Sequence, residues 1–399
     1  MLHKSFKNVP EVLKPTLIGK VPKSIKGTYV QNGPGEFYHG GILSHPFDGD
    51  GYIRKIEFKE GKAYFQGRYN QTWQRQLEQW LNIRLFTGAF GTYPRHCLLK
   101  NPVNTNIIPI YNHQLAASSE MGKTYLLNQT TLETVGIHST PISAHTHQGI
   151  SVERIYSHSK TQLKFQEITV TLPHFVYFHD FAVTSNYYGF IDHGLTMDVW
   201  KGFKEGWVDG LTFQHQPSTF YLIHRSTQEL ISISIPNVIG FSYHFICAKE
   251  TSTTLEFQYI LYPTFFSNPS QQCPGQVYQT IIHKEDYSQT TQCIQSEWME
   301  MPMYDPSTEE CFVILPKQNG IGRFHTITHE LTVYKEPNKI FNEPFFDKDY
   351  VMTLVYDRET METYLYLFDR LKSFTEPMTN KLPISIPMGL HGTYINKSI

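Results

Sequence analysis

Four histidines of this chain lie in apolar sequence surroundings, where a buried polar side chain needs a hydrogen-bond partner or a metal. They lie mostly between aromatic or small apolar residues, in SAHTHQG (His145), YFHDF (His179), SYHFICA (His244) and GLHGTY (His391). A buried polar group without a partner costs roughly 2–7 kcal/mol, so a backbone group, a carboxylate or a metal must compensate it. The four are far apart in the sequence, unlike the two ligands of HExxH that share one helical face. Spacing alone therefore favours ordinary core histidines over a shared metal, which would require separate strands to converge.

The elements that would position these histidines are predicted to be β-strands. Short alternating or apolar runs recur along the chain and are bounded by Gly, Pro, Asn or Asp. They include 52–58, 62–69, 163–172, 254–262, 330–336, 350–357 and 362–369. The first two form a hairpin-like pair around Glu60 and Gly61. The pattern predicts an all-β protein but does not choose among a sandwich, a barrel and a propeller.

One segment differs from the strands. In WQRQLEQWLNIRLF (73–86) the apolar residues recur at helical spacing, at Trp73, Leu77, Trp80, Leu81 and Leu85. One interpretation is a helix whose apolar stripe packs on the β-core. The other is a helix that lies in a membrane surface, with Trp and Leu on the buried face.

Composition excludes several functional classes. The chain has 399 residues, of which 40% are hydrophobic, and a net charge of −2, so no basic excess indicates nucleic acid. Five cysteines without a CxxC spacing argue against a disulfide framework or a zinc knuckle and favour a reducing compartment. The N-terminus has no apolar run of signal-peptide length, and no window of about 18 apolar residues could span a membrane. We therefore expect a cytoplasmic protein.

Several motifs, in this order, resemble the carotenoid cleavage oxygenases. The resemblance runs from about residue 14 to the C-terminus. It rests on NGPG (32–35), FDGDG (47–51), TLET (131–134), HDFAVTSNY (179–187), YHFICA (243–248), EMP (300–302), NEPFF (342–346) and GLHG (389–392).

The resemblance implies a seven-bladed β-propeller with a helical and loop cap over its top face. We expect a single domain over 1–399, with an extension at about 1–13 and a cap or entry region at 73–91. An Fe(II) ion would sit on the axis. Carried over one at a time, its ligands would be His145, His179, His244 and His391, with Glu120, Glu300 and Glu343 accepting hydrogen bonds from them. Four neutral imidazoles suit ferrous iron and leave open positions for dioxygen.

Within HDF, the resemblance makes His179 a metal ligand. We expect Asp180 and Thr184 to shape the turn and the strand through local hydrogen bonds.

The chain departs from the family pattern at a few positions. Gln31 stands where the family usually has Arg before NGPG, and Cys247 replaces an Asn near His244. Thr146 and His147 replace the usual Pro after the first ligand, so His147 competes with His145 for that role; we favour His145 because it follows Ala144 as the pattern requires. We expect Cys247 to be a small buried hydrophobic residue.

The resemblance implies an enzyme that inserts O₂ across a C=C bond of a carotenoid or apocarotenoid and releases two carbonyl products. A stilbene is an alternative substrate, with Tyr93 gripping a phenol, although no convincing Lys partner is found. A second alternative is a non-catalytic propeller that binds an apocarotenoid. The expected partners are an apolar polyene and O₂, and a membrane surface contacted through 73–91. We expect a monomer that binds no nucleic acid.

Overall fold

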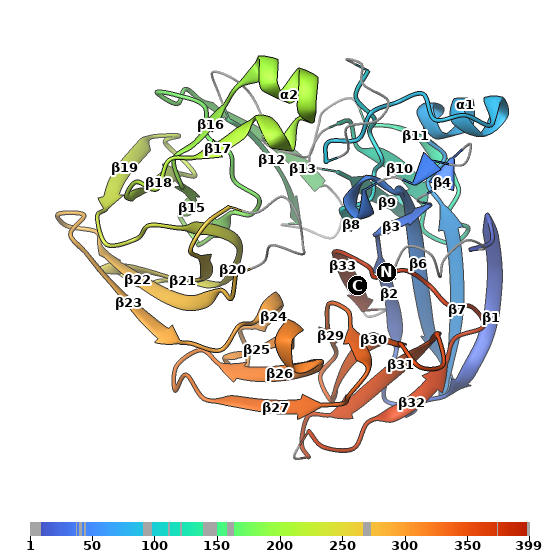
Figure 1. The fold of residues 1–399 in the computed structure, drawn as a ribbon. Helices are drawn as coiled ribbons and strands as arrows, with labels where there is room; N and C mark the ends of the chain where they lie inside the picture. The colour runs from blue at the N-terminus through green and yellow to red at the C-terminus, as the bar shows by residue number, and fades with distance from the viewer. Residues whose placement is uncertain are drawn as a thin grey trace.

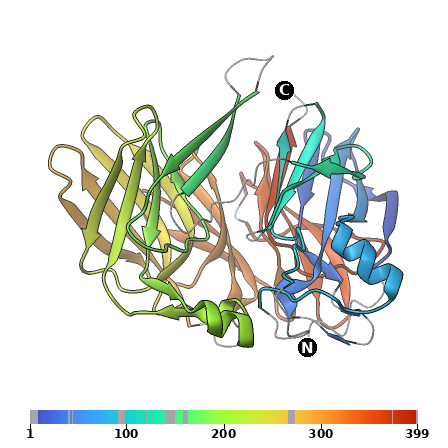
Figure 2. The same ribbon diagram turned by 90° about the horizontal axis from the view of Figure 1, so that it is seen from above.

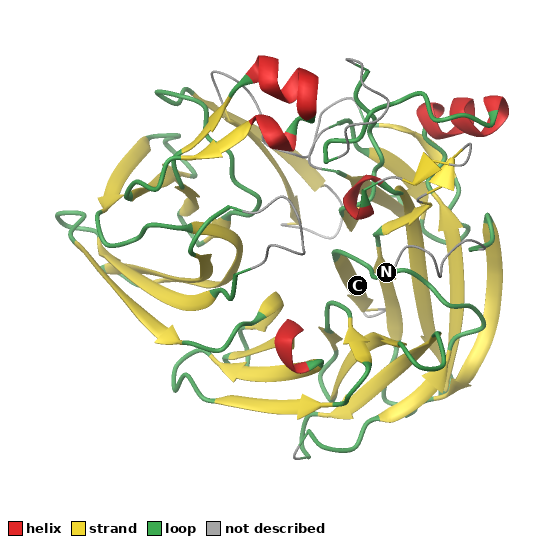
Figure 3. Ribbon diagram, viewed as in Figure 1, coloured by secondary structure: helices red, strands yellow, loops and turns green. Residues whose placement is uncertain are grey.

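Strands form nearly the whole molecule in the computed structural model, and they are arranged as sheets around a central axis (Figures 1 and 3). The structure describes residues 9–36, 38–39, 42–43, 45–90, 98–110, 112–119, 122–138, 150–157, 163–265, 273–372 and 374–396. This arrangement of radially repeated antiparallel sheets is a β-propeller, as expected. The number of blades, expected to be seven, stays a prediction.

Most sheets are meanders of consecutive antiparallel strands, and in each the strand nearest the axis comes first in the chain. The first of these sheets contains β14 (Ala182–Val183), β15 (Tyr187–Asp192), β18 (Ser218–His224) and β19 (Leu230–Ile235), and the second contains β20 (Phe241–Glu250), β21 (Thr254–Tyr262), β22 (Gln276–His283) and β23 (Gln289–Gln295). The third contains β24 (Glu300–Asp305), β25 (Glu310–Leu315), β26 (Gly320–His325) and β27 (Leu331–Lys335). The fourth contains β28 (Lys339–Phe341), β30 (Tyr350–Asp357), β31 (Glu362–Asp369) and β32 (Met378–Lys381), and β29 (Phe345–Phe346) also pairs with β30.

Two further sheets precede these in the chain. One sheet contains β11 (Thr134–Ile137), β10 (Tyr125–Asn128), β9 (Gln114–Ser118) and β8 (Asn106–Ile110), and another contains β12 (Ile150–Ser157) and β13 (Leu163–Val170). Two short hairpins are formed by β16 (Leu195–Met197) with β17 (Leu211–Phe213), and by β4 (Tyr38–His39) with β5 (Ile42–Leu43).

The two ends of the chain meet in one sheet. Its order is β1 (Val12–Lys20), β7 (Lys62–Tyr69), β6 (Asp50–Lys59), β2 (Gly27–Gln31) and β33 (Gly392–Asn396), and β3 (Pro34–Glu36) also pairs with β6. β2 and β33 are antiparallel, from Gly27 opposite Asn396 to Gln31 opposite Gly392. This pairing closes the ring and brings the NGPG segment beside the segment of His391.

The predicted strands 62–69, 254–262, 350–357 and 362–369 coincide with observed strands, and 52–58 lies inside β6. Glu60 and Gly61 form the predicted turn, with φ of 53° and 73°. Both positive φ values match the two-residue turn that suits the twist of a hairpin. β1 begins at Val12, within the stretch that we expected to be an extension.

The hydrophobic core is divided into packets between neighbouring sheets. Phe220 and Leu222 of β18 pack with Phe257 and Tyr259 of β21, for example. Other packets join the sheet of β20–β23 to that of β24–β27, and the latter to the sheet of β28–β32. Because each sheet buries both faces against its neighbours, inner strands such as β2 are buried at every residue.

The helical segment is shorter than predicted, and its orientation contradicts the first of our two interpretations. α1 spans Trp73–Leu81, with Thr72 as its N-cap, and ends at Asn82 in the left-handed region. The exposed fractions are 80% for Trp80 and 40% for Leu81, whereas Gln74, Arg75 and Glu78 are buried. The polar face, not the apolar stripe, packs on the β-core because its partners there are charged groups and backbone amides.

A second short helix, α2 (Val199–Glu205), also exposes large apolar side chains. Trp200 and Phe203 are 75% and 45% exposed. Figure 2 shows α1 and α2 towards the same face of the ring. No helix within the described ranges is long and apolar enough to cross a membrane.

Candidate metal centre

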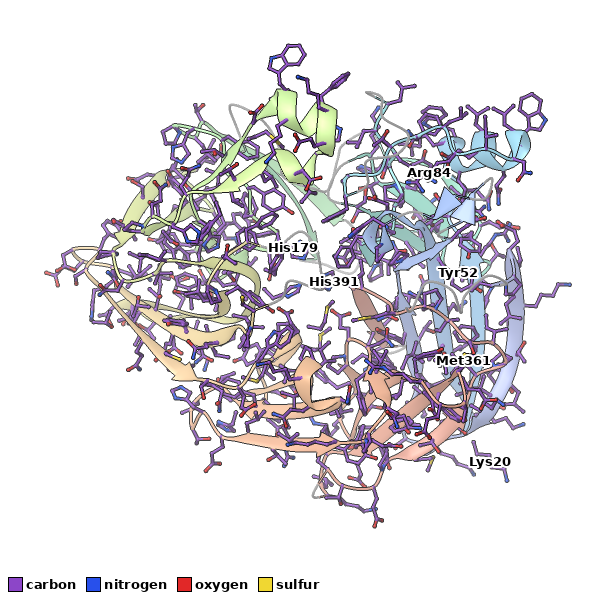
Figure 4. All side chains as sticks on the ribbon, in the orientation of Figure 1. Lys20, Tyr52, Arg84, His179, Met361 and His391 are labelled. Carbon is purple, nitrogen blue, oxygen red and sulfur yellow. The ribbon has the colours of Figure 1, made fainter. Side chains whose placement is uncertain are left out.

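His179, His244 and His391 converge at the centre of the ring. One ring nitrogen of each lies within 4.8 Å of the others, and the Nε2 atoms of His244 and His391 are 3.4 Å apart. Figure 4 shows His179 and His391 beside the central opening. The three histidines are far apart in the sequence because they come from different sheets of the ring, and these sheets meet at its axis.

Each of these histidines lies on, or a few residues before, a strand near the axis. His244 lies on β20, His179 precedes β14, and His391 precedes β33. The pairing of β20 with β21 shifts register between Ser242 and Phe245, on either side of His244. Such a bulge turns a side chain away from the regular pleat, which here lets an inner-strand residue face the axis.

Glu300 orients His244. The Nδ1 atom of His244 lies 2.7 Å from Glu300 Oε2, and a carboxylate can only accept, so Nδ1 carries the proton. Glu300 also accepts from the Tyr262 hydroxyl and, at 3.0 Å, from the Met301 N–H. Trp298 Nε1 in turn donates to the Tyr262 oxygen at 2.9 Å. Glu300 is thus held by a chain of buried aromatic residues.

Glu343 has the same relation to His391. The Nδ1 atom of His391 lies 2.8 Å from Glu343 Oε1, and the N–H of Gly392 donates to Glu343 Oε2 at 2.6 Å. Glu343 is only 4% exposed. His391 therefore also has its proton on Nδ1 and a lone pair on Nε2.

This arrangement fits a metal cation. Two Nε2 lone pairs face each other at 3.4 Å, and both Nδ1 protons are committed to carboxylates. Lone pairs at that distance repel unless a cation lies between them. A histidine that binds a metal through one nitrogen and donates from the other to a carboxylate is the usual arrangement in metal sites.

The charge balance of the site agrees. Among the described residues, neither Glu300 nor Glu343 forms an ion pair with Lys or Arg; each contacts a histidine instead. Burial by itself would raise the pKa of Glu300, but His244, Tyr262 and the Met301 N–H lower it below its ordinary value. The negative charge that this keeps on Glu300 makes a cation near the axis favourable.

The other predicted site residues lie outside the described residues. These are His145 and its competitor His147, Glu120, and Tyr93. Of the seven side chains proposed to form or support the metal site, the structure places His179, His244, His391, Glu300 and Glu343 together. That they bind a metal stays a prediction.

Asp180 forms the expected local hydrogen bond and also a distant one. Its Oδ1 accepts from the Phe181 N–H at 2.8 Å, and its Oδ2 accepts from the Phe245 N–H at 2.9 Å. Thr184 bonds locally with Tyr187, as predicted. The bond to Phe245, which ties the His179 segment to the His244 strand, was not predictable, because it joins residues that are 65 positions apart in the sequence.

An aromatic cluster borders the site. The ring of Tyr243 lies 5.8 Å from that of His179, and Tyr243 also contacts Phe241 and Phe265. Tyr177 extends the cluster through Phe241. The sequence signal was the aromatic flanking of His179 and His244, which we interpreted only as an apolar setting.

Cys247 is buried, as expected, and burial raises the pKa of its thiol to about 12. Because the thiolate is the reactive form, this cysteine is a poor nucleophile and a poor metal ligand at neutral pH.

Comparisons with known proteins identify the family and agree with the fold. A family model described as retinal pigment epithelial membrane protein matches residues 3–396. The apocarotenoid-15,15'-oxygenase of Synechocystis sp. is 26% identical over 94% of this chain and 91% of its own length. Carotenoid cleavage oxygenase 1 of Neurospora crassa is 24% identical over 96% of this chain and 87% of its own. The crystal structure of the cobalt-substituted Synechocystis apocarotenoid oxygenase superposes with a TM-score of 0.86 at 21% identity, covering 99% of this chain and 98% of that one.

Proposed function

The chain belongs to the retinal pigment epithelial membrane protein family, which includes the carotenoid cleavage oxygenases, and from this premise we propose that it is an Fe(II) dioxygenase acting on a carotenoid or apocarotenoid. The observation that carries the proposal is the convergence of His179, His244 and His391, two of which are oriented by carboxylates. The reaction adds both atoms of O₂ to the two carbons of one C=C bond. The bond breaks and two carbonyl products form, so no other oxidant is required.

His179, His244 and His391 would hold the iron, with His145 as the fourth ligand. Bound Fe(II) would supply the activation of dioxygen, which does not react readily with a closed-shell polyene. The protein groups supply orientation: Glu300 and Glu343 keep the protons on Nδ1, so that the Nε2 atoms remain ligands. Asp180 holds two of the ligand-bearing segments together.

The surroundings of His179 suit an apolar substrate. Tyr243 contacts His179 directly, and Tyr177, Phe241 and Phe265 pack with Tyr243 in one aromatic cluster. Aromatic faces bind a conjugated chain through dispersion and offset stacking, and a mainly apolar lining excludes water. This chemistry supports a polyene better than a hydrophilic substrate.

The inverted orientation of α1 supports contact with a membrane surface, where a polyene is dissolved. Trp80 and Leu81 are exposed on α1, Trp200 and Phe203 are exposed on α2, and the two helices lie towards the same face of the ring. Amphipathic helices with exposed Trp and Leu bind at the headgroup boundary. Free thiols at Cys247, Cys273, Cys293 and Cys311 suit a reducing compartment. We therefore infer a cytoplasmic protein that attaches reversibly to a membrane surface.

The first experiment measures iron in protein purified without added metal or a metal-binding tag. We expect about one iron per chain in the wild type, because imidazole sites retain first-row metals. His179→Ala should lose the iron, whereas the exposed His283→Ala should keep it. Oxygen uptake and aldehyde formation are then followed with apocarotenals and with a stilbene.

The outcomes separate the alternatives. Turnover of apocarotenals with loss of one O₂ per double bond supports the proposal, and cleavage of only the stilbene would change the substrate class. Stoichiometric binding of apocarotenal without product would favour a binding propeller. Absence of iron from the wild type, even after anaerobic loading with Fe(II), would contradict the metal site itself.

A further inference from the structure

The segment that delivers His391 to the axis has no regular secondary structure of its own. Residues 387–391 precede β33 and take no part in a sheet. Its backbone N–H and C=O groups must therefore find partners elsewhere, because buried backbone groups are rarely left unpaired. The position of His391 depends on what those partners are.

The N–H groups of the segment are bound by neighbouring blades. Gly389 donates to Asn342 Oδ1 at 2.5 Å, Leu390 to the Asn32 carbonyl at 2.8 Å, and His391 to the Thr105 carbonyl at 3.0 Å. These contacts come from three different parts of the chain. They fix one side of the segment.

The carbonyl groups are bound mainly by two side chains. Nη2 of Arg54 donates to the carbonyls of Pro387 and Met388, at 3.0 and 3.4 Å. Nε2 of Gln31 donates to the carbonyl of Leu390 at 3.1 Å. Both side chains are 0% exposed. Together they hold three of the four peptide units directly before His391.

Gln31 and Arg54 act from directly opposite positions. They are paired residues of the neighbouring antiparallel strands β2 and β6, so their side chains point to the same face. The packing there is close: a β-carbon at Gly33 would lie 2.4 Å from Arg54 Nη1, and one at Gly389 would lie 2.1 Å from Gln31 Oε1. The two glycines let these side chains reach the backbone of the segment.

Burying Arg54 is costly unless its contacts compensate. Within the described residues no carboxylate is among the groups that act on its pKa; burial lowers that pKa to about 10, so Arg54 is still a cation at neutral pH. Desolvating such a cation is unfavourable, and bonds to carbonyl dipoles offset part of that cost. The hydrogen bonds from Arg54 to the carbonyls of Pro387 and Met388 are therefore the contacts that explain why a cation is buried here.

We propose that Arg54 and Gln31 are positioning residues for His391. The family pattern has Arg at position 31, where this chain has Gln, and the structure places Arg54 directly across the ladder from it. In this chain β6 supplies the guanidinium that the pattern assigns to β2. The proposal rests on the metal site proposed above, because its consequence is the geometry of one ligand.

The test compares metal affinity with folding stability. Co(II) binding to apoprotein is measured by equilibrium dialysis, and stability by urea unfolding, for Arg54→Gln, Arg54→Lys and Gln31→Leu. A swapped double variant, Gln31→Arg with Arg54→Gln, returns the guanidinium from the opposite strand. Lys55→Gln is the matched control, because Lys55 is the next residue of β6, is also buried, and binds the carbonyls of Gln129 and Thr130, away from the histidines.

We expect Arg54→Gln to weaken Co(II) binding about 10- to 100-fold, as losses of supporting contacts around metal ligands typically do. The swapped variant should recover most of that affinity. Lys55→Gln should lose stability and keep the affinity of the wild type.

Equal Co(II) affinity in Arg54→Gln and Lys55→Gln would overturn the proposal. If Arg54→Gln does not fold, Arg54→Lys and Gln31→Leu decide in its place, and affinity unchanged in both would overturn it. If the wild type bound no Co(II), the metal site would fail first, so the two failures are distinguishable.

Discussion

At the scale of single residues, the site is defined by where protons reside. A carboxylate on Nδ1 leaves Nε2 as the ligand atom, and the structure shows this for His244 and His391. The sequence offered the correct residue types, but it could not show which glutamate faces which histidine. That pairing depends on the direction in which each strand near the axis points its side chains.

His193 is a buried histidine of the ordinary kind. Its Nε2 accepts from the Ser242 N–H at 3.1 Å, and its Nδ1 lies 3.3 Å from Ser218 Oγ, so the ring is neutral. Burial lowers the pKa of His193 to about 3. It illustrates the alternative that spacing alone favoured for all four candidate ligands.

This pKa predicts an acid-dependent loss of stability. The unfolded chain binds a proton on His193 below about pH 6.5 while the folded chain does not, so stability falls as pH falls towards 3, by up to ~1.4 kcal/mol per pH unit. Between pH 6.5 and 4.5 the free energy of unfolding should drop by about 2 kcal/mol more in the wild type than in His193→Gln. Urea unfolding at both pH values measures this. An equal difference for the exposed His283→Gln would assign the effect to another cause.

At the scale of elements, buried charges hold α1 to the ring. Lys100 Nζ binds Asp50 at 2.8 Å and Glu78 at 2.6 Å, and all three side chains are at most 2% exposed. Glu78 also accepts from the N–H groups of Leu85 and Phe86. Part of the FDGDG motif thus anchors a helix, a role that its sequence does not reveal.

Removing the shared cation should be severe. Lys100→Met removes the cation that two buried carboxylates share, so we expect a loss of about 3–5 kcal/mol in the free energy of unfolding. Urea unfolding measures the loss. The exposed pair of Lys381 with Glu362 provides the comparison, since solvent screens this pair and Lys381→Met should change the stability little. Similar losses in the two variants would show that the buried cluster does not stabilise the fold.

At the scale of the whole molecule, the closure of the ring by β2 and β33 supports our proposal that 1–399 is a single domain. The ring brings segments that are distant in sequence to one axis, and it sets α1 and α2 towards one face. A monomeric state stays a prediction.

The exposed helices predict binding to lipid. Trp80→Glu with Leu81→Glu should reduce co-sedimentation with phosphatidylcholine liposomes at least about ten-fold, because burying large apolar side chains is worth ~1.5–3 kcal/mol each and two charges oppose it. The control is Ile327→Glu with Leu371→Glu, which changes two exposed apolar residues outside both helices. Unchanged binding of the first variant would contradict the role of α1 in membrane contact.

Local patterns predicted the strands, because alternation and turn residues act within a few positions: Lys62–Tyr69 and Glu362–Asp369 were predicted to the residue. The family resemblance supplied the candidate metal ligands. How His179, His244 and His391 meet, why Asp180 reaches Phe245, and which face of α1 is buried became visible in the folded chain alone. These features depend on charges and backbone groups that distant segments supply. A local pattern for α1 records its own apolar stripe, but not the buried Lys100 that attracts its opposite face.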